Sequence, residues 1–493
     1  MLAIETTYQA KAKLVQELDA DVYVNRNGEV TRAAFRTSLY QGDKGMLDGQ
    51  PSRAGLAAWP RIFSFCGGSH QLAAVQALEH AWQASPPPNA HLLRSIAQAA
   101  EIMQTASRWF YTSFGPDLAN PYFAEQPLHA QTSARFTAFK GASFQRGILA
   151  GALPTALFAL FAGQWPYADF LVPGGAQIEL TAEKIQHALG LLERYRREWL
   201  EPQWLGDSLE RYLALASWEE LLAWLDEAPA QRDSDLGLFL RASRAFGLDG
   251  FGGGAGKYLA YGAFWNSKTD GSVSPRQHQS AAQLPGGFWD EAGFRPLDTE
   301  QLPAYLRGEL AGKHDLNESA ETGPLARLMV GAAQPERTGS HPLIADIARQ
   351  QGPSAFLRAF ARMHELCLLC HLTQQWLSAL DPQAPCLTPV EERDGTGIGL
   401  TEAPRGALAH QVVLKNGKIE SYTILAPTIL NLHPRVPDKQ LAPLAEAIKG
   451  LALRSLENPF EVGLIARSFD SCLACNTRLL KNRSGLEIGR GRV

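Results

Sequence analysis

The chain has 493 residues, enough for one large domain or two to three ordinary ones. Its 45% hydrophobic and 19% charged residues are typical of a globular protein and argue against a disordered one. The formal net charge of -4 gives no support for a nucleic-acid or acidic-lipid partner, although the last residues are locally basic.

The sequence also predicts a cellular compartment. The N-terminus is charged within its first five residues and contains no apolar signal core. The longest apolar stretch, GILAGALPTALFALFAG, is about the minimum length of a membrane span and is interrupted by Pro154, so we expect a buried helix there. Six cysteines without an export signal indicate the reducing cytoplasm, where a Cys-x-x-Cys pair is more often a metal or redox site than a disulfide.

Strands are predicted near both ends of the chain, with helices between them. Residues 20–40 alternate apolar and polar side chains around an Asn-Gly pair, which is typical of a β-hairpin, and HQVVLKNGKIESYTILAPT repeats this pattern. Gly/Pro-rich connectors such as DGFGGGAGKYLAYG and SAAQLPGGFWDEAG separate the helices. In chain order, the stretches with helical period are HQLAAVQALEHAWQA, HLLRSIAQAAEIMQTASRWFYTSF, TAEKIQHALGLLERYRREWL, PLIADIARQQG, PSAFLRAFARMHELCLLCHLTQQWLSAL and LAPLAEAIKGLALRSL.

These elements predict an α+β, mainly helical protein of one domain, residues 1–493. We expect a long helical core and a β layer formed from the N- and C-terminal hairpins, so that the two ends of the chain meet. The expected parts are an N-terminal β layer at 1–60, a helical core at 61–382, a β-hairpin region at 383–440, and a C-terminal helix with a cysteine motif at 441–493.

Two cysteine-bearing stretches suggest a metal site. Cys472 and Cys475 form a Cys-x-x-Cys pair, and Cys66 stands four residues before His70. A Cys-x-x-Cys loop can direct two sulfurs at one ion, and a thiolate from elsewhere can complete a soft-ligand site. Taken alone, each signal leaves a structural cysteine open.

A third stretch, ELCLLCH, carries Cys367, Cys370 and His371 inside a strongly apolar helical run. It matches the c-type haem attachment pattern, but that attachment requires export. Cysteines also pack well as small apolar side chains. We therefore expect both cysteines to be core residues, and Cys386 to be structural.

The stretch GLTEAPRGALAHQVVLKNGKIESYTILAPTILNLHPR, followed by a helix and ARSFDSCLAC, resembles the C-terminal third of [NiFe]-hydrogenase large subunits. That family carries an E-x-P-R-G-x-L-x-H stretch, a hairpin, a P-T-x-x-N-x-x-P-R stretch and a closing S-F-D-P-C-x-x-C-x-x-H. Near the N-terminus, RIFSFCGGSHQLAAVQALE is similar to the family's R-I-C-G-x-C-x-x-x-H motif. The resemblance covers essentially the whole chain and implies the large-subunit fold.

The resemblance implies a metal site from which one ligand is missing. In the enzymes four thiolates hold the metals: two bind nickel alone, and two bridge nickel to an iron that carries cyanide and carbon monoxide. Cys66 and Cys475 match the bridging cysteines, and Cys472 matches one terminal nickel ligand. The other terminal ligand falls on Phe63, which has no donor atom.

Two further departures concern proton transfer and maturation. Lys44 stands where the family has a glutamate suited to handling protons. Arg478 replaces the histidine after which the maturation protease cuts, and which helps to bind magnesium in the enzymes. The resemblance therefore implies an uncleaved tail and gives no support for nickel or magnesium.

The positions that hold the iron ligands are retained. Pro404, Arg405 and Thr428 match the positions that cradle the cyanides, and guanidinium, hydroxyl and backbone N–H groups are donors suited to a metal-bound cyanide.

Two more residues belong to this implied site. His70 would donate a hydrogen bond to the Cys66 sulfur, although a helix-capping histidine is an alternative. Asp117 would match the aspartate above the metals, paired to Arg405, although an aspartate in a surface turn is an alternative. None of these residues is predicted to be catalytic.

The departures favour a non-enzymatic maturation scaffold over a working hydrogenase. The chain is most similar to hydrogenase assembly proteins of the HupK/HoxV type, which implies that it binds the Fe(CN)2(CO) moiety and passes it on. The implied partners are a small cofactor-carrying chaperone, the iron–cyanide assembly complex and the hydrogenase large-subunit precursor, with no nucleic acid or membrane. A divergent oxidoreductase or hydrogen-sensing subunit with an altered metal site, and a metal-free paralogue, remain alternatives.

Overall fold

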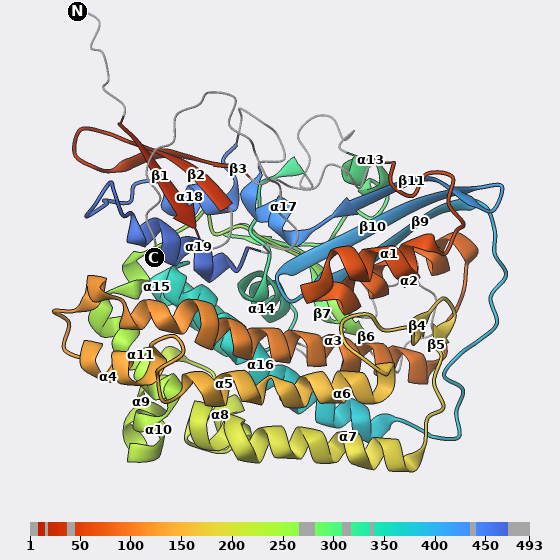
Figure 1. The fold of residues 1–493 in the computed structure, drawn as a ribbon, viewed down its shortest axis with the longest axis horizontal. Coiled ribbons are helices and arrows are strands. Elements are labelled where there is room, and N and C mark those ends of the chain that lie inside the picture. The colour runs from red at the N-terminus through yellow and green to blue at the C-terminus, as the bar shows by residue number, and fades with distance from the viewer. Residues whose placement is uncertain are drawn as a thin grey trace, which may run out of the picture.

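The computed structural model describes residues 8–14, 18–36, 45–265, 282–307, 317–335, 340–433 and 440–471. Over these ranges the protein is mainly helical with small sheets, as the sequence predicts. Helices form the body of the molecule, and strands gather along one side of it (Figure 1).

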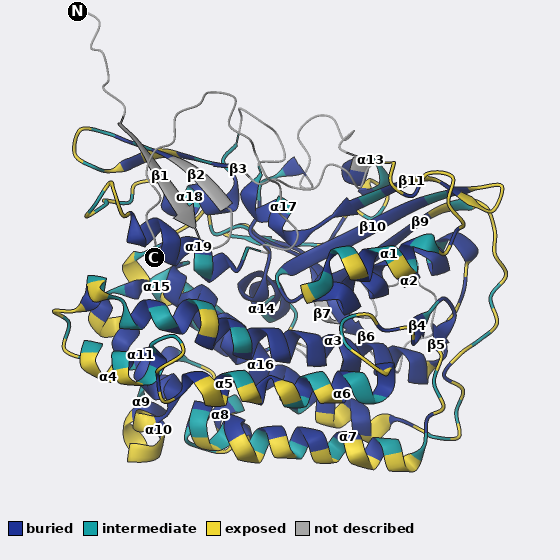
Figure 2. Ribbon diagram, in the orientation of Figure 1, coloured by how far each residue is buried: buried dark blue, intermediate teal, exposed yellow. Residues whose placement is uncertain are grey.

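Two long helices form the centre of the helical body. They are α3 (Pro88–Trp109) and α16 (Ala355–Ala379), and both are buried along most of their length (Figure 2). The other helices are α1 (Ala54–Ile62), α2 (Gly67–Trp82), α4 (His129–Phe136), α5 (Phe144–Ala150), α6 (Ala152–Ala162), α7 (Ala182–Tyr195), α8 (Leu209–Leu213), α9 (Trp218–Glu227), α10 (Pro229–Asp233), α11 (Asp235–Phe246), α13 (Leu302–Arg307), α14 (Pro324–Ala332), α15 (Pro342–Gln351), α17 (Pro427–Leu432), α18 (Pro443–Ile448) and α19 (Phe460–Phe469). All but the last of the predicted helices match helices of similar extent.

The apolar stretch around Pro154 forms the consecutive helices α5 and α6, which pack against α3. By length and composition Phe144–Ala162 could cross a membrane, and 44% of its most apolar window is buried inside the protein. The expected burial therefore holds for one face of these helices. Leu149, on the other face, is 69% exposed.

Both predicted hairpins are present. The N-terminal sheet has the order β1 (Tyr8–Leu14), β2 (Leu18–Val24), β3 (Val30–Arg36), and the C-terminal sheet has the order β11 (Lys418–Leu425), β10 (Gly406–Lys415), β9 (Gly395–Ala403). At the tip of the second hairpin, Asn416 and Gly417 both have positive φ, 54° and 70°. This is the conformation that an Asn-Gly pair adopts at low cost in a two-residue hairpin turn.

The two ends of the chain meet, but the predicted last helix is shorter than expected. After α18 the backbone turns at Gly450, whose φ is 80°, and runs beside the N-terminal hairpin. The Val30 N–H donates to the Leu451 carbonyl oxygen at 2.8 Å, and the Gly450 N–H donates to that of Val30 at 2.8 Å. Pairing with β3 therefore replaces the last turns of the expected helix.

A third sheet corrects the prediction that two Gly/Pro-rich stretches are connectors. Those stretches contain β6 (Tyr258–Trp265) and β7 (Ala282–Asp290), which pair antiparallel and extend to β8 (Gly293–Arg295). Gly287 has no room for a side chain, because a Cβ there would lie 2.4 Å from the Phe294 ring. That glycine serves close packing within a strand rather than a turn. The short strands β4 (Leu171–Val172) and β5 (Gly175–Ala176) form a separate ribbon.

Candidate metal centre

Helix α2 lies on strand β9 in a way that sets the position of Cys66. A Cβ on Gly397 would lie 1.8 Å from the Ala77 carbonyl oxygen, and one on Gly399 would lie 2.0 Å from that of Ala73. These contacts move toward the N-terminus of α2 as the strand runs toward Ala403. The start of α2 therefore lies near the turn between β9 and β10.

Cys66 stands at that start. It ends a 3₁₀ turn, Ser64–Cys66, and is the N-cap residue of α2. Its side chain is buried, 4% exposed, in an apolar cluster that includes Ala403, Ala426 and Ile429. Ala403 directly precedes Pro404 and Arg405, and Thr428 lies between the other two cluster members. The cluster thus joins Cys66 to residues that are next to Pro404 and next to Thr428 in the sequence.

His70 is buried within α2 and belongs to a hydrogen-bonded chain. Its Nδ1 lies 2.9 Å from His410 Nε2, and His410 Nδ1 lies 2.9 Å from the Tyr422 hydroxyl. The N-cap of α2 is Cys66, so the capping alternative for His70 is wrong. Burial lowers the pKa of His410 well below its ordinary value, and the nearby His70 adds to this. His410 and Tyr422 were not predicted, although both stand inside the motif stretches.

Phe63 packs directly against this chain. Its ring stacks on the His70 imidazole, with centroids 4.0 Å apart and planes 10° apart. The side chain is 5% exposed and also contacts Trp59, at 6.2 Å between ring centroids. An aromatic ring, seven residues before His70 in the sequence, therefore fills the space beside that imidazole.

Arg405 pairs with Asp470, and a second buried arginine shares that carboxylate. Arg405 Nε donates to the Asp470 carbonyl oxygen at 2.9 Å and lies 3.3 Å from Asp470 Oδ2. Arg362 Nη1 lies 3.1 Å from the same Oδ2 and donates to the Pro404 carbonyl oxygen at 3.0 Å. Burial lowers the pKa of Arg362 to about 10, opposed by Asp470 and assisted by Arg405. Two guanidinium groups thus face one carboxylate.

The predicted pairing of Asp117 with Arg405 is wrong. Asp117 accepts a hydrogen bond from Arg467 Nε at 2.6 Å, because α19 carries Arg467 to the 3₁₀ turn that contains Asp117. The surface-turn alternative is also wrong, since Asp117 is 6% exposed. Burial raises the pKa of Asp117 above its ordinary value, and Arg467 opposes this rise.

Sequence reasoning also missed Glu101. This carboxylate, on α3, accepts hydrogen bonds from the Gly68 and Ser69 N–H groups, both at 2.9 Å, and from the Trp165 indole at 3.2 Å. Burial raises its pKa, and the Ser69 hydroxyl opposes this most strongly. Glu101 thus satisfies the first N–H groups of the helix that begins beside Cys66. No motif links a residue so distant in sequence to that helix end.

Glu402, in the E-x-P-R-G stretch, belongs to a buried ionic network. Arg327 contacts Glu365 through two hydrogen bonds of 2.6 Å and Glu402 through one of 2.9 Å. Burial raises the pKa of Glu402 to about 7, opposed by Arg327. The network fixes the end of β9 just before Pro404.

The remaining predicted residues lie outside the described part of the chain: Lys44, Cys472, Cys475 and Arg478. In sequence, Asp470 stands two residues before Cys472. Among the described residues, no cluster of three or more His, Cys, Asp or Glu side chains could hold a metal ion. Phe63, at one of the expected thiolate positions, offers no lone pair to a metal. Cys66, Arg405 and Thr428 are the described residues that would hold an iron fragment with cyanide ligands, and Cys66 packs in the same apolar cluster as Ala403 and Ala426.

Cys367 and Cys370 are core residues, as expected. Both are 0% exposed inside α16. Burial raises the pKa of Cys367 well above its ordinary value, and the pKa of Cys370 rises for the same reason. Cys386 is also buried, and Asn89 Nδ2 lies 3.9 Å from its sulfur.

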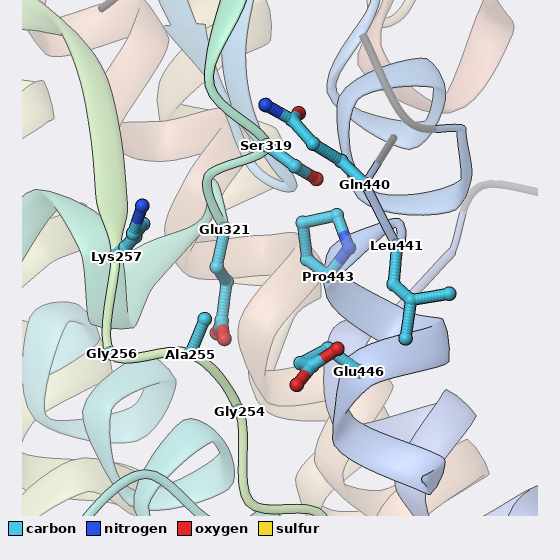
Figure 3. Close-up of a pocket in the computed structure, with 10 residues that line it drawn as sticks. All are labelled: Gly254, Ala255, Gly256, Lys257, Ser319, Glu321, Gln440, Leu441, Pro443 and Glu446. Carbon is cyan, nitrogen blue, oxygen red and sulfur yellow. The ribbon is translucent and has the colours of Figure 1, made fainter. Parts of the chain in front are cut away.

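A cavity of about 250 Å³ lies apart from the candidate centre (Figure 3). It opens between the glycine-rich loop before β6 and helix α18, and its polar walls include Lys257, Glu321 and Glu446. Lys257 is paired with Glu318 at 2.7 Å, and Glu321 with Arg358 at 2.8 Å. No residue predicted to bind metal or cyanide lines it.

Fold and site together define a protein of the hydrogenase large-subunit type. The family model described as nickel-dependent hydrogenase matches residues 42–143 and 314–478. The chain therefore belongs to the nickel-dependent hydrogenase family.

Relatives of known name support this over nearly the full length. The chain is 25% identical to the large subunit of the periplasmic [NiFeSe] hydrogenase of Desulfomicrobium baculatum, covering 94% of this chain and 92% of the relative. It is 24% identical to the hydrogenase-1 large chain of Escherichia coli K12, covering 93% and 92%.

Solved structures agree on the fold. A Dm. baculatum [NiFeSe]-hydrogenase structure matches with a TM-score of 0.74 and 22% identity, covering 96% of this chain and 99% of the other. The reduced enzyme of D. vulgaris Hildenborough matches with a TM-score of 0.73.

Proposed function

We propose that this protein is a non-enzymatic maturation scaffold for [NiFe] hydrogenase. It binds the Fe(CN)2(CO) moiety through Cys66 and Cys475, with Cys472 nearby, and passes it on during assembly of a large subunit. The observation that carries this proposal is the Phe63 ring, stacked at 4.0 Å on His70 at the position of a nickel ligand.

The loss of that ligand lowers nickel affinity more than changes in the groups around the ligands could restore. Nickel requires electron-pair donors, and an aromatic ring supplies none. Changes in groups around the ligands typically alter metal affinity or activity by ~10–100-fold, whereas a lost ligand removes a bond to the metal. In this proposal Arg405, Thr428 and the Pro404 segment supply the donors to the cyanide ligands of the iron. The relatives' names describe hydrogenases, so the scaffold role rests on this difference in the site.

The proposal extends to location and partners. The protein acts in the cytoplasm with a small cofactor-carrying chaperone and the iron–cyanide assembly complex. The acceptor of its cargo is the hydrogenase large-subunit precursor, and neither nucleic acid nor a membrane takes part.

Infrared spectroscopy and metal analysis test the proposal. Protein purified from a host with the maturation machinery is expected to contain iron without nickel and to show CN and CO stretching bands. Stoichiometric nickel together with hydrogen uptake contradicts the scaffold role. Absence of diatomic-ligand bands in such protein favours a metal-free paralogue.

A paired substitution isolates the role of Phe63. Phe63→Cys restores a thiol at the missing position and is expected to increase nickel retention over that of the wild type. Phe65→Cys is the matched control, because Phe65 lies two residues further on and is 55% exposed. Equal nickel retention in the two variants contradicts the view that Phe63 is what excludes nickel.

A divergent oxidoreductase or hydrogen-sensing subunit is the second candidate function. The observation in its favour is that two relatives, both named as hydrogenases, match more than nine-tenths of this chain. Hydrogen-dependent reduction of a dye by the purified protein would support it.

A further inference from the structure

The buried chain from Tyr422 to His70 has a direction that follows from its donors and acceptors. His70 Nδ1, His410 Nε2, His410 Nδ1 and the Tyr422 hydroxyl are linked by two contacts of 2.9 Å. His70 and His410 are 0% exposed, and Tyr422 is 6% exposed. Three side chains from α2, β10 and β11 therefore form one continuous polar path within an apolar cluster.

The phenol end of the path fixes the direction. A buried O–H that lacks an acceptor is costly, and His410 Nδ1 is within hydrogen-bond distance of the Tyr422 oxygen. If Tyr422 donates to Nδ1, the neutral His410 carries its one proton on Nε2. Burial keeps His410 neutral by lowering its pKa. His410 Nε2 then donates to His70 Nδ1, and the proton of a neutral His70 stands on Nε2.

We propose that Tyr422 and His410 are positioning residues that hold His70 as the Nε2–H tautomer, so that this N–H is donated to the Cys66 thiolate when iron is bound. The proposal rests on the proposed function for the identity of the bound iron fragment. Cys66 is the N-cap residue of α2, and His70 lies four residues further on, in the first turn of that helix.

Aromatic packing holds the rings of this path in place. Phe63 stacks on His70 with planes 10° apart, and Trp59 meets His410 edge-on, with ring centroids 6.3 Å apart. Trp59 also lies 5.0 Å from the Tyr422 ring. The ring that replaces a nickel ligand thus also fixes the plane of His70.

The hydrogen bond from His70 to the Cys66 sulfur is expected to change the CO stretching wavenumber in one direction. A hydrogen bond to a metal-bound thiolate withdraws electron density from the sulfur, and groups behind a ligand tune a metal in this way. Less density on the iron means less back-donation into carbon monoxide and a higher CO stretching wavenumber. Breaking the path at Tyr422 or His410 should therefore shift the CO band to lower wavenumber.

The experiment compares iron-loaded variants by infrared spectroscopy. Tyr422→Phe and His410→Leu are expected to shift the CO band to lower wavenumber and to reduce iron retention, with losses in the range of ~10–100-fold. His410→Gln, which can still donate an amide N–H toward His70, is expected to restore part of the shift. An unmoved CO band in Tyr422→Phe and His410→Leu overturns the proposal.

His80→Leu is the matched control. His80 is on the same helix and accepts a hydrogen bond from the Ile398 N–H of β9 at 3.0 Å, but it lies outside the path. This substitution removes a partly buried imidazole from the same helix–sheet interface, so the CO band of the variant is expected to stay at the wild-type position. If the CO band of this control shifts as much as that of Tyr422→Phe, then any disturbance of the packing between α2 and β9 moves the band. That result would also overturn the proposal.

A second measurement separates this inference from the scaffold role. ¹⁵N NMR of histidine-labelled apoprotein reports the tautomer of each ring without any iron. We expect the Nε2–H tautomer for His70 and His410 in the wild type, and a loss of this preference in Tyr422→Phe. A proton on Nδ1 of His70 in the wild type overturns the inference. If the wild type shows the expected tautomers but no diatomic-ligand bands, the scaffold role fails and the tautomer assignment stands.

Discussion

Two regions of this protein carry buried cysteines with a histidine close by in the sequence, and they differ in their surroundings. Cys66 lies at the start of α2, near the segment that carries Arg405 and close to the His70–His410 pair. Cys367 and Cys370 lie in the middle of α16, where the nearest titrating groups include Tyr195 and Tyr212. The α16 pair has the better-formed motif, and the lone Cys66 has the better surroundings for metal chemistry.

For the prediction of a metal site, the hydrogen-bond donors and cations around a sulfur are more informative than the spacing of two cysteines. A thiolate is stabilised by hydrogen-bond donors, cations and helix N-termini, and is disfavoured in apolar surroundings. Cys66 has a helix start and lies close to an arginine-bearing turn, whereas burial raises the pKa of both α16 cysteines.

The difference between the two thiol regions can be tested by removing each thiol in turn. Cys66→Ser is expected to abolish the CN and CO bands of the purified protein, because it removes an iron ligand, and Cys475→Ser should do the same. Cys367→Ser is expected to leave the bands in place. Infrared bands that survive in Cys66→Ser, or vanish only in Cys367→Ser, would reverse the ranking of the two regions.

The charged surroundings of the first region can be tested by removing the shared carboxylate. Asp470→Asn keeps a residue that tolerates the positive φ of 51° at this position, but removes the carboxylate charge that Arg362 and Arg405 share. We expect a loss of about 3 kcal/mol in the free energy of unfolding, measured with urea.

The double variant Asp470→Asn with Arg362→Gln is the control for this experiment. It removes one of the two uncompensated guanidinium groups and should recover part of the lost stability. A double variant less stable than the sum of the two single losses would contradict the sharing of one carboxylate.

The apolar surroundings of the second region predict that the cysteine which is not needed for the infrared bands matters more for folding stability. Cys367→Ser places a hydroxyl where the side chain is 0% exposed within the helical core, so we expect it to cost about 1–2 kcal/mol. Cys66→Ser should cost less, because polar groups lie near the start of α2. Thermal and urea unfolding of the two apoproteins measure this difference.

The smallest expected effect is a pH dependence centred on the second region. His364, one turn before Cys367, contacts the Tyr212 hydroxyl at 3.0 Å, and burial lowers its pKa well below the ordinary value of 6.5. As the pH falls through 6.5 the unfolded chain binds a proton that the folded protein does not, so the free energy of unfolding decreases. Between pH 6.5 and 5.5 this histidine should contribute a loss of about 1 kcal/mol.

His364→Gln should remove this part of the acid sensitivity. Urea unfolding at pH 7 and at pH 5.5 is the measurement, and the variant is expected to lose less stability than the wild type over that interval. An equal loss in both proteins would show that other buried histidines, such as His410, dominate.

The sequence predicted the hairpins and long helices because their signals are local. Asn416-Gly417 specifies a turn within two residues, and α16 repeats its apolar side chains with helical period over its whole length. The strands β6 and β7 were missed because their glycines mimic a flexible connector. Gly287 is a glycine to make room for Phe294, a reason that exists only after the strands pair.

The residues of the candidate site divide in the same way between local sequence signals and tertiary contacts. Cys66, His70, Arg405 and Thr428 are expected at the site because their motifs match those of a family over the whole chain, and their roles stay predictions. The pairing of Asp117 could not, since a carboxylate selects whichever guanidinium the packing brings nearest. Arg467 and Arg405 are equivalent candidates in sequence, and the position of α19 decides between them.

The sequence by itself determined the helical class, the two hairpins, the family resemblance and the missing donor at Phe63. Those features depend on residue identity and short-range spacing, which the chain carries unfolded. Tertiary structure alone decided that Phe63 stacks on His70, that Tyr422 and His410 stand behind it, and that Arg362 shares Asp470 with Arg405. These contacts join residues up to 340 positions apart, as between His70 and His410, and packing sets them.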